Sequence, residues 1–202
     1  MNFDQPNNEV IKTPEVKIKK GVNFVFEQNP KLAKIGTELQ YSKYLETVFP
    51  ESKIKDIVYH GSKIKNIKKF SEFTHFGTKE AAEHRVKTKS EWNIENFKNK
   101  FGNKVTNLLK NNSLFVRLIK NKEYHYPVVI NLKNIKEKKD EYSYFTKQLI
   151  EDKEAGYDGY KYENELEDKG STSYVVFEPE QIHILGLNQD VEKFKEFVSS
   201  ND

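Results

Sequence analysis

Ile57-Val58-Tyr59-His60-Gly61-Ser62 is the most informative stretch of this chain, because an apolar β-type run ends there in polar residues. Two runs of the same character follow, Thr74-His75-Phe76-Gly77-Thr78 and the segment from Ser173 to Gln181, which reads Ser-Tyr-Val-Val-Phe-Glu-Pro-Glu-Gln. β-branched and aromatic residues favour strands, but packing alone does not require the polar groups in these runs. We therefore expect three strands that converge on a cleft suited to a flat polar ligand.

Composition sets bounds on the class of protein. The 202 residues fit one domain with a sizeable core, and 34 basic against 31 acidic residues leave a net charge of only +3, too little to argue for nucleic acid. Cysteine is absent, which excludes disulfides, thiol nucleophiles and thiolate metal sites. No run approaches the roughly 20 apolar residues of a membrane helix, and no secretory apolar segment is present. We expect a cytoplasmic protein, of the producing or a target cell, without a membrane partner.

The hydrophobic pattern predicts an α+β fold. We expect a flexible tail over residues 1–20 and a single domain over 21–202. Thr37 and Gln40 form a capping-box pattern for a helix over 36–49 that Pro50 ends. Thr78 is expected to cap a short helix that turns Ala81, Ala82 and Val86 inward.

The remaining elements follow from periodicity. A polar, Lys/Asn-rich stretch predicts a helical insertion over about 88–112. Strands cluster without regular alternation with helices, which is typical of α+β proteins. Helices are expected over 140–153 and 190–199, and strands over 54–60, 114–119, 127–132, 157–162, 174–177 and 182–185.

The three polar runs carry groups that suit an aromatic amide joined to a sugar. Such a ligand needs a histidine or hydroxyl for the sugar, backbone groups for the amide and an aromatic face for stacking. Gly61 lets a ligand approach main-chain N–H and C=O groups closely. These groups could come from His60, Gly61, Ser62, Phe76 and Tyr174.

Other common sites are not indicated by the sequence. His125 and His183 have no partner at metal-ligand spacing, so we expect no metal. No Gly-x-Gly-x-x-Gly or phosphate-loop pattern occurs, which removes the commonest nucleotide-binding folds.

An ordered set of motifs over about residues 22–198 resembles the ADP-ribosyltransferase superfamily. The likeness is to its histidine-first branch (diphtheria toxin and PARP), in particular to domains of phage and mobile-element polyvalent proteins. It rests on the following residues: Gly36-Thr37, Gln40-Tyr41-Ser42, Phe49-Pro50, Tyr59-His60-Gly61, His75-Phe76-Gly77-Thr78 with Ala81, Gly156-Tyr157-Asp158-Gly159, Tyr162, Asn164, Glu167, and the run from Ser173 to Ile182.

The resemblance implies a fold and an activity. The fold would be a split β-sheet, with NAD⁺ as co-substrate in a cleft between two facing β-layers and with no metal. The activity would be mono-ADP-ribosyl transfer, a glycosyltransferase reaction, to a macromolecular acceptor (protein or nucleic acid) with release of nicotinamide. Such a domain would serve as a toxin-like phage or mobile-element effector.

The resemblance also assigns roles. His60 would bond the ribose next to the adenine, the Gly61 backbone would pair with the nicotinamide amide, and His75 or Phe76 would stack the nicotinamide. The family's usual glutamate position is occupied by Ser173, which carries no charge. We therefore expect Glu167, from the preceding loop, to act on the ribose, with Glu163 and Glu165 as alternatives. The expected NAD⁺-binding set is completed by Tyr59, Ser62, Thr78, Asn164 and Tyr174.

Three alternatives remain open at this stage. The acceptor could supply the base itself, or the domain could bind NAD⁺ or ADP-ribose without turnover, consistent with Ser173. A nucleic-acid interaction protein could instead use the basic stretch from Lys53 to Lys69.

Overall fold

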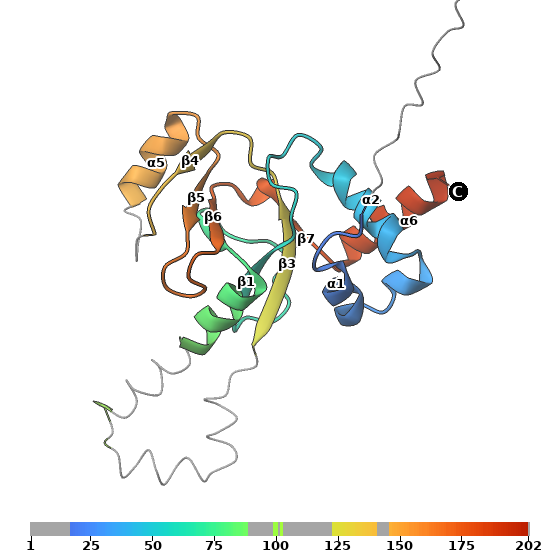
Figure 1. Ribbon diagram of the computed structural model, residues 1–202, viewed down its shortest axis with the longest axis horizontal. Helices are drawn as coiled ribbons and strands as arrows, with labels where there is room; N and C mark the ends of the chain where they lie inside the picture. The colour runs from blue at the N-terminus through green and yellow to red at the C-terminus, as the bar shows by residue number, and fades with distance from the viewer. Residues whose placement is uncertain (1–16, 89–98, 101, 103–122, 141–145, 202) are drawn as a thin grey trace, which may run out of the picture.

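The computed structural model describes residues 17–88, 99–100, 102, 123–140 and 146–201, and within them two β-sheets and several helices confirm the α+β class (Figure 1). One sheet has the strand order β1-β3-β7, and the other has the order β2-β6-β5-β4. The strands are β1 (Val58–Ser62), β2 (Thr74–Phe76), β3 (Tyr124–Ile130), β4 (Ile135–Glu137), β5 (Gly159–Glu163), β6 (Thr172–Val176) and β7 (Ile182–Ile184).

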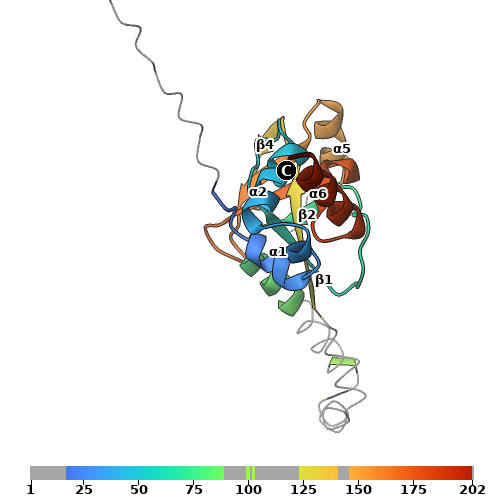
Figure 2. The ribbon, with the colours of Figure 1, turned by 90° about the vertical axis from the view of Figure 1, so that its right-hand side faces the viewer.

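Helices cover the outer sides of both sheets. Helices α1 (Val22–Gln28), α2 (Glu38–Val48) and α6 (Asn188–Asn201) gather beside the three-stranded sheet, whereas α5 (Thr146–Glu154) lies beside the four-stranded one (Figures 1 and 2). Short 3-10 turns, Leu32–Lys34 and Pro179–Gln181, connect α1 to α2 and β6 to β7.

The core divides into three layers that follow this arrangement. Under α1, α2 and α6 lie buried side chains such as Leu32, Tyr41 and Phe194. Between the sheets lie side chains from both, among them Val128 and Val176. The third layer packs Leu149 of α5 against β5, β6 and Phe177. Two facing sheets with a shared apolar layer thus form the centre of the molecule.

The predicted helix caps are confirmed. The Thr37 hydroxyl accepts from the Gln40 N–H at 3.2 Å, and the Gln40 side chain accepts from the Thr37 N–H at 2.9 Å. The Thr78 hydroxyl accepts from the Ala81 N–H at 3.1 Å at the start of a helix described over residues 79–88. On that helix Ala81, Ala82 and Val86 are buried, as predicted.

Some predictions differ from the structure. Strand β1 begins at Val58 rather than at residue 54, because the Ser52 hydroxyl bonds both Ile130 and Leu132 and holds the preceding segment in a turn. Asp158-Gly159 is a dipeptide typical of hairpin turns, but it does not form one here. Its carboxylate accepts from the N–H groups of residues 133 and 134, and β5 then pairs in parallel with β4.

Other expected segments lie wholly or largely outside the described residues. These are residues 1–16 of the tail, most of the insertion over 88–112, the strand over 114–119 and residues 141–145 of the helix that becomes α5. Within the expected tail, Lys19 is attached to the domain, since its N–H donates to the Ser42 hydroxyl at 3.0 Å and its ammonium pairs with Glu46.

A buried carboxylate joins the helices to the three-stranded sheet. Asp190 of α6 is fully buried and accepts from the hydroxyls of Tyr41 and Tyr44 at 2.5 and 3.1 Å. It also pairs with His183 Nε2 at 2.8 Å and accepts from the Gly186 N–H at 2.7 Å. Burial, together with the negative charge of Asp190, raises the pKa of both tyrosines. This network fixes the positions of α2, β7 and α6 relative to one another.

Gly61 is the point at which the 79–88 helix touches β1. A Cβ atom there would overlap the Ala82 carbonyl oxygen and would lie 2.6 Å from Val86 Cγ2. We predict that Gly61→Ala lowers the free energy of unfolding by about 1–3 kcal/mol, the usual cost of overpacking, as measured by urea denaturation.

Gly156→Ala is the contrasting variant, because its φ of +89° is unfavourable for alanine but nothing lies within 4 Å of the added Cβ. It should cost about 1 kcal/mol from the backbone alone and leave the amide signals of Ala82 and Val86 unmoved. A Gly61→Ala variant that also leaves those signals unmoved would contradict the close packing of helix and strand.

Candidate functional site

Among the described residues, one β-bridge, between Tyr59 and Gly77, joins the two sheets edge to edge. The Tyr59 N–H donates to the Gly77 carbonyl at 2.8 Å, and the Gly77 N–H donates back at 3.1 Å. Backbone groups alternate sides along a strand, so the N–H and C=O of Gly61 point to the same edge of β1 as those of Tyr59. Past the bridge, in the part of the chain that the structure describes, this edge faces a pocket rather than another strand.

The pocket is formed by β1, β2, the 79–88 helix, β5, the loop after β5 and β6. Its walls combine backbone, aromatic rings, one cation and one carboxylate. The lining residues are Tyr59, His60, Gly61, His75, Phe76, Gly77, Ala81, Ala82, Arg85, Tyr162, Asn164, Glu167 and Ser173.

Most of the residues expected from the sequence come together here. Eight line the pocket: Tyr59, His60, Gly61, His75, Phe76, Asn164, Glu167 and Ser173. Three do not. Ser62 uses its hydroxyl to accept from the Ile64 N–H at 3.1 Å, and Thr78 caps its helix and donates to Asp168 at 2.6 Å. Tyr174 packs between the sheets and borders a neighbouring hollow of about 630 Å³.

His60 is held in a defined orientation. Its Nδ1 lies 2.9 Å from the His75 carbonyl oxygen, and its ring centroid lies 5.0 and 5.8 Å from those of Phe70 and Phe76. A carbonyl oxygen can only accept, so Nδ1 must carry the proton, and in the neutral ring Nε2 is then the acceptor. Phe76 itself is 2% exposed and belongs to the apolar layer between the sheets.

His75 points to the other face of its sheet from Phe76. Its Nδ1 lies 3.1 Å from the Tyr162 hydroxyl, which links β2 to β5. Burial, assisted by the Arg85 charge and opposed by Glu167, lowers the pKa of His75 to about 4. The imidazole is therefore neutral at pH 7, which suits it to hydrogen bonding rather than to binding an anion.

Asn164 organises the loop that carries Glu167. Its side chain is buried, and its Oδ1 accepts from three successive N–H groups, those of residues 166, 167 and 168, at 3.1, 2.8 and 3.0 Å. Its Nδ2 donates to Glu167 Oε2 at 3.0 Å and to the Ser173 hydroxyl at 3.1 Å. The loop glutamate is thereby held next to the strand position of Ser173.

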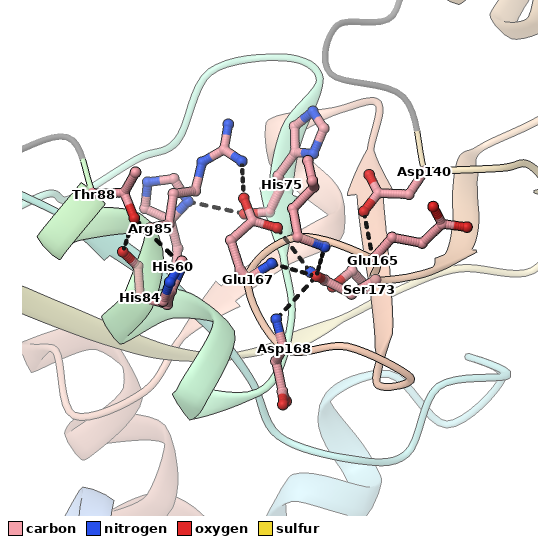
Figure 3. A network of polar contacts seen from close by, with 12 residues as sticks. His60, His75, His84, Arg85, Thr88, Asp140, Glu165, Glu167, Asp168 and Ser173 are labelled. Atoms are coloured by element: carbon pink, nitrogen blue, oxygen red, sulfur yellow. Dashed lines mark hydrogen bonds and ion pairs between the residues drawn. The ribbon is translucent and has the colours of Figure 1, made fainter. Parts of the chain in front are cut away.

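Glu167 is also paired with a cation. Arg85 Nη1 lies 2.7 Å from Glu167 Oε1 (Figure 3), and the Glu167 side chain is 14% exposed. The two alternative glutamates, Glu163 and Glu165, are exposed and do not line the pocket. Among the three, Glu167 alone has a carboxylate in the pocket wall.

Five lining residues were not among the expected site residues: Gly77, Ala81, Ala82, Arg85 and Tyr162. Ala81 and Ala82 were expected as the inward face of their helix, and Gly77, Ala81 and Tyr162 as parts of the quoted motifs. Arg85 follows Ala81 and Ala82 at helical spacing, so its face could have been read from the sequence. Gly77 is required because a Cβ there would lie 2.7 Å from the Ser173 hydroxyl oxygen, and no local pattern reveals a contact between segments so far apart.

The described residues bear on two further expectations. They contain no group of histidine, aspartate and glutamate side chains that could hold a metal ion. No helix in this part of the chain has the length and apolar character needed to cross a membrane.

Comparison with known proteins adds no assignment: no protein-family model, no curated protein and no solved structure matches this chain.

We predict that Asn164→Ala removes the hydrogen-bond acceptor of the backbone N–H groups of residues 166, 167 and 168. Loss of their shared acceptor should speed hydrogen exchange at these positions and reduce stability by about 1–3 kcal/mol. Asn164→Asp keeps an acceptor oxygen but sets a second carboxylate against Glu167, and like charges repel, so its amide protection should fall between those of wild type and Asn164→Ala. Equal exchange rates in all three proteins would show that the loop does not depend on this side chain.

His75 should make folding sensitive to acid. Its folded pKa of about 4 lies below the ordinary value of about 6.5, so between these values the unfolded chain binds more protons. Stability then falls as the pH drops from 6.5 toward 4, by at most about 1.4 kcal/mol per pH unit from this group. The test is to measure the free energy of unfolding of wild type and His75→Gln across this pH range. Stability of the variant should decline less steeply as the pH falls, and parallel curves of stability against pH would contradict a neutral buried His75.

Proposed function

We propose that this protein transfers ADP-ribose from NAD⁺ to a macromolecular acceptor, protein or nucleic acid, and releases nicotinamide. The observation that carries the proposal is the meeting of His60, the Gly61 backbone edge and Glu167 in one pocket between two β-sheets. This is also the arrangement that an ADP-ribosyltransferase-like split sheet would provide, with NAD⁺ as co-substrate.

The Gly61 edge is suited to a primary carboxamide. An amide presents a donor and an acceptor side by side, as does the N–H and C=O pair of one residue in an extended strand. Because Tyr59 uses the same edge to bind Gly77, this pair is already aimed away from β3. In the proposed complex the nicotinamide amide binds here, and the imidazole of His60 hydrogen-bonds a ribose hydroxyl.

Glu167 supplies the negative charge that Ser173 lacks. In the reaction the bond between ribose and nicotinamide breaks, positive charge develops on the sugar, and nicotinamide leaves as a neutral molecule. An acceptor nucleophile then bonds to the same carbon and gives up its proton. A carboxylate fixed near the ribose lowers the energy of the charged transition state. Asn164 helps to fix Glu167 for this role through its 3.0 Å bond.

The runner-up function is binding of NAD⁺ or ADP-ribose without turnover. Ser173 favours it, because a hydroxyl can bond a ribose but cannot offset positive charge. Under this alternative the pocket serves recognition, and Glu167 is a structural partner of Arg85.

The decisive assay incubates the protein with labelled NAD⁺ and cell lysate and follows both label transfer and nicotinamide release. Glu167→Gln should reduce transfer by about 100-fold or more, the usual effect of removing a group that stabilises transition-state charge. His60→Ala should reduce transfer by about 100-fold as well, because the ribose loses the side chain that positions it. Glu165→Gln is the matched control, since Glu165 is exposed one residue from Asn164, and it should leave transfer unchanged.

Two results would overturn parts of the proposal. Equal transfer by wild type and His60→Ala would remove His60 from the mechanism. Calorimetric binding of NAD⁺ without nicotinamide release would replace catalysis by the runner-up function.

A further inference from the structure

The pocket is nearly filled by its own side chains. Only about 20 Å³ within it is open to the centres of water molecules, room for roughly one water. Sites for small organic molecules usually measure about 300–1,000 Å³. A planar ring can therefore enter only after a wall of the pocket moves.

The walls differ in their freedom to move. Ser173 and Tyr162 lie in the four-stranded sheet and are buried. Glu167 is held by the Asn164 side chain and through its own N–H. Arg85 is different, because its long side chain is 43% exposed and reaches from the 79–88 helix across the pocket to Glu167 (Figure 3). Arg85 is therefore the lining side chain that can move out of the pocket.

For Arg85 to separate from Glu167, its guanidinium needs another anion to bind. Glu167 and Arg85 are only partly exposed, so separating them without a replacement would leave both charges poorly solvated. A guanidinium binds phosphate oxygens through two parallel N–H groups, as it does a carboxylate. A pyrophosphate next to the pocket would compete for Arg85 and would release Glu167 at the same time.

We propose that Arg85 is the gate and the pyrophosphate-binding residue of this pocket: it leaves Glu167 when a dinucleotide enters. This inference rests on the proposed function and adds a residue and an order of events to it. Binding of the phosphates and exposure of the Glu167 carboxylate are then one coupled step, since the same guanidinium cannot satisfy both anions in full.

Calorimetry with three probes tests the gate: ADP-ribose, which carries the pyrophosphate, nicotinamide, which is neutral and small, and NAD⁺. In Arg85→Met, affinity for ADP-ribose and NAD⁺ should fall by about 10- to 100-fold, the range of a charge-assisted hydrogen bond. Affinity for nicotinamide should rise, because methionine does not hold the pocket closed on Glu167. Arg85→Lys should fall between wild type and Arg85→Met for ADP-ribose.

Lys87→Met is the matched control, because it removes one positive charge from an exposed position two residues along the same helix. It should change none of the three affinities by more than about twofold, as expected for a distant exposed charge. Thermal unfolding of each variant shows whether it is still folded. If Arg85→Met is not folded, the comparison of Arg85→Lys with wild type tests the gate.

The outcomes separate this inference from the function on which it rests. Wild type that binds none of the probes overturns the proposed function and the gate with it. Suppose instead that wild type binds ADP-ribose. If Arg85→Met then binds ADP-ribose equally tightly, or binds all three probes more weakly by the same factor, the gate is overturned and the proposed function stands. Opposite changes for ADP-ribose and nicotinamide support the gate.

Discussion

The structure depends on one short backbone contact, the reciprocal pair of hydrogen bonds between Tyr59 and Gly77 at 2.8 and 3.1 Å. This bridge joins the edge of β1 to the end of β2 and so fixes how the two sheets meet. A longer ladder would have made one continuous sheet, and the edge of β1 beyond Tyr59 would have been occupied. Because the described strands pair here through one bridge, Gly61 keeps a backbone edge that faces side chains from β2, β5 and β6.

Buried polar residues hold the surrounding elements at fixed distances. Asn164 connects the loop after β5 to β6, Asp190 connects α6 to α2 and β7, and Asp152 accepts from Lys136 and Tyr160 at 2.6 Å each to tie α5 to the four-stranded sheet. Each of these residues is at most 7% exposed. Buried polar groups are costly unless their hydrogen bonds are satisfied, so each network favours one arrangement of the segments that it joins. The pocket has a defined shape because these hydrogen-bond networks fix the segments that line it or support them.

Local features were predictable because their causes are local. The capping pair of Thr37 and Gln40, the cap at Thr78 and the inward face of Ala81 and Ala82 all depend on residues within one or two helical turns. The turn expected at Asp158-Gly159 failed for the opposite reason. Its carboxylate is used by backbone N–H groups 24 and 25 residues earlier in the chain, and this distant partner turns a typical hairpin dipeptide into the start of a parallel strand.

The α+β class and most of the described strands and helices could be predicted from side-chain character and period along the chain, whereas most of the eight expected residues that line the pocket were indicated by the family resemblance. The three-dimensional arrangement was needed to show that Ser62, Thr78 and Tyr174 lie outside the pocket. It was also needed to show that Glu167, rather than Glu163 or Glu165, lines the pocket and that Arg85 pairs with its carboxylate. The physical reason is that these outcomes depend on which face of each strand is turned inward and on contacts across 82 residues of chain. Such contacts leave no periodic trace in the sequence.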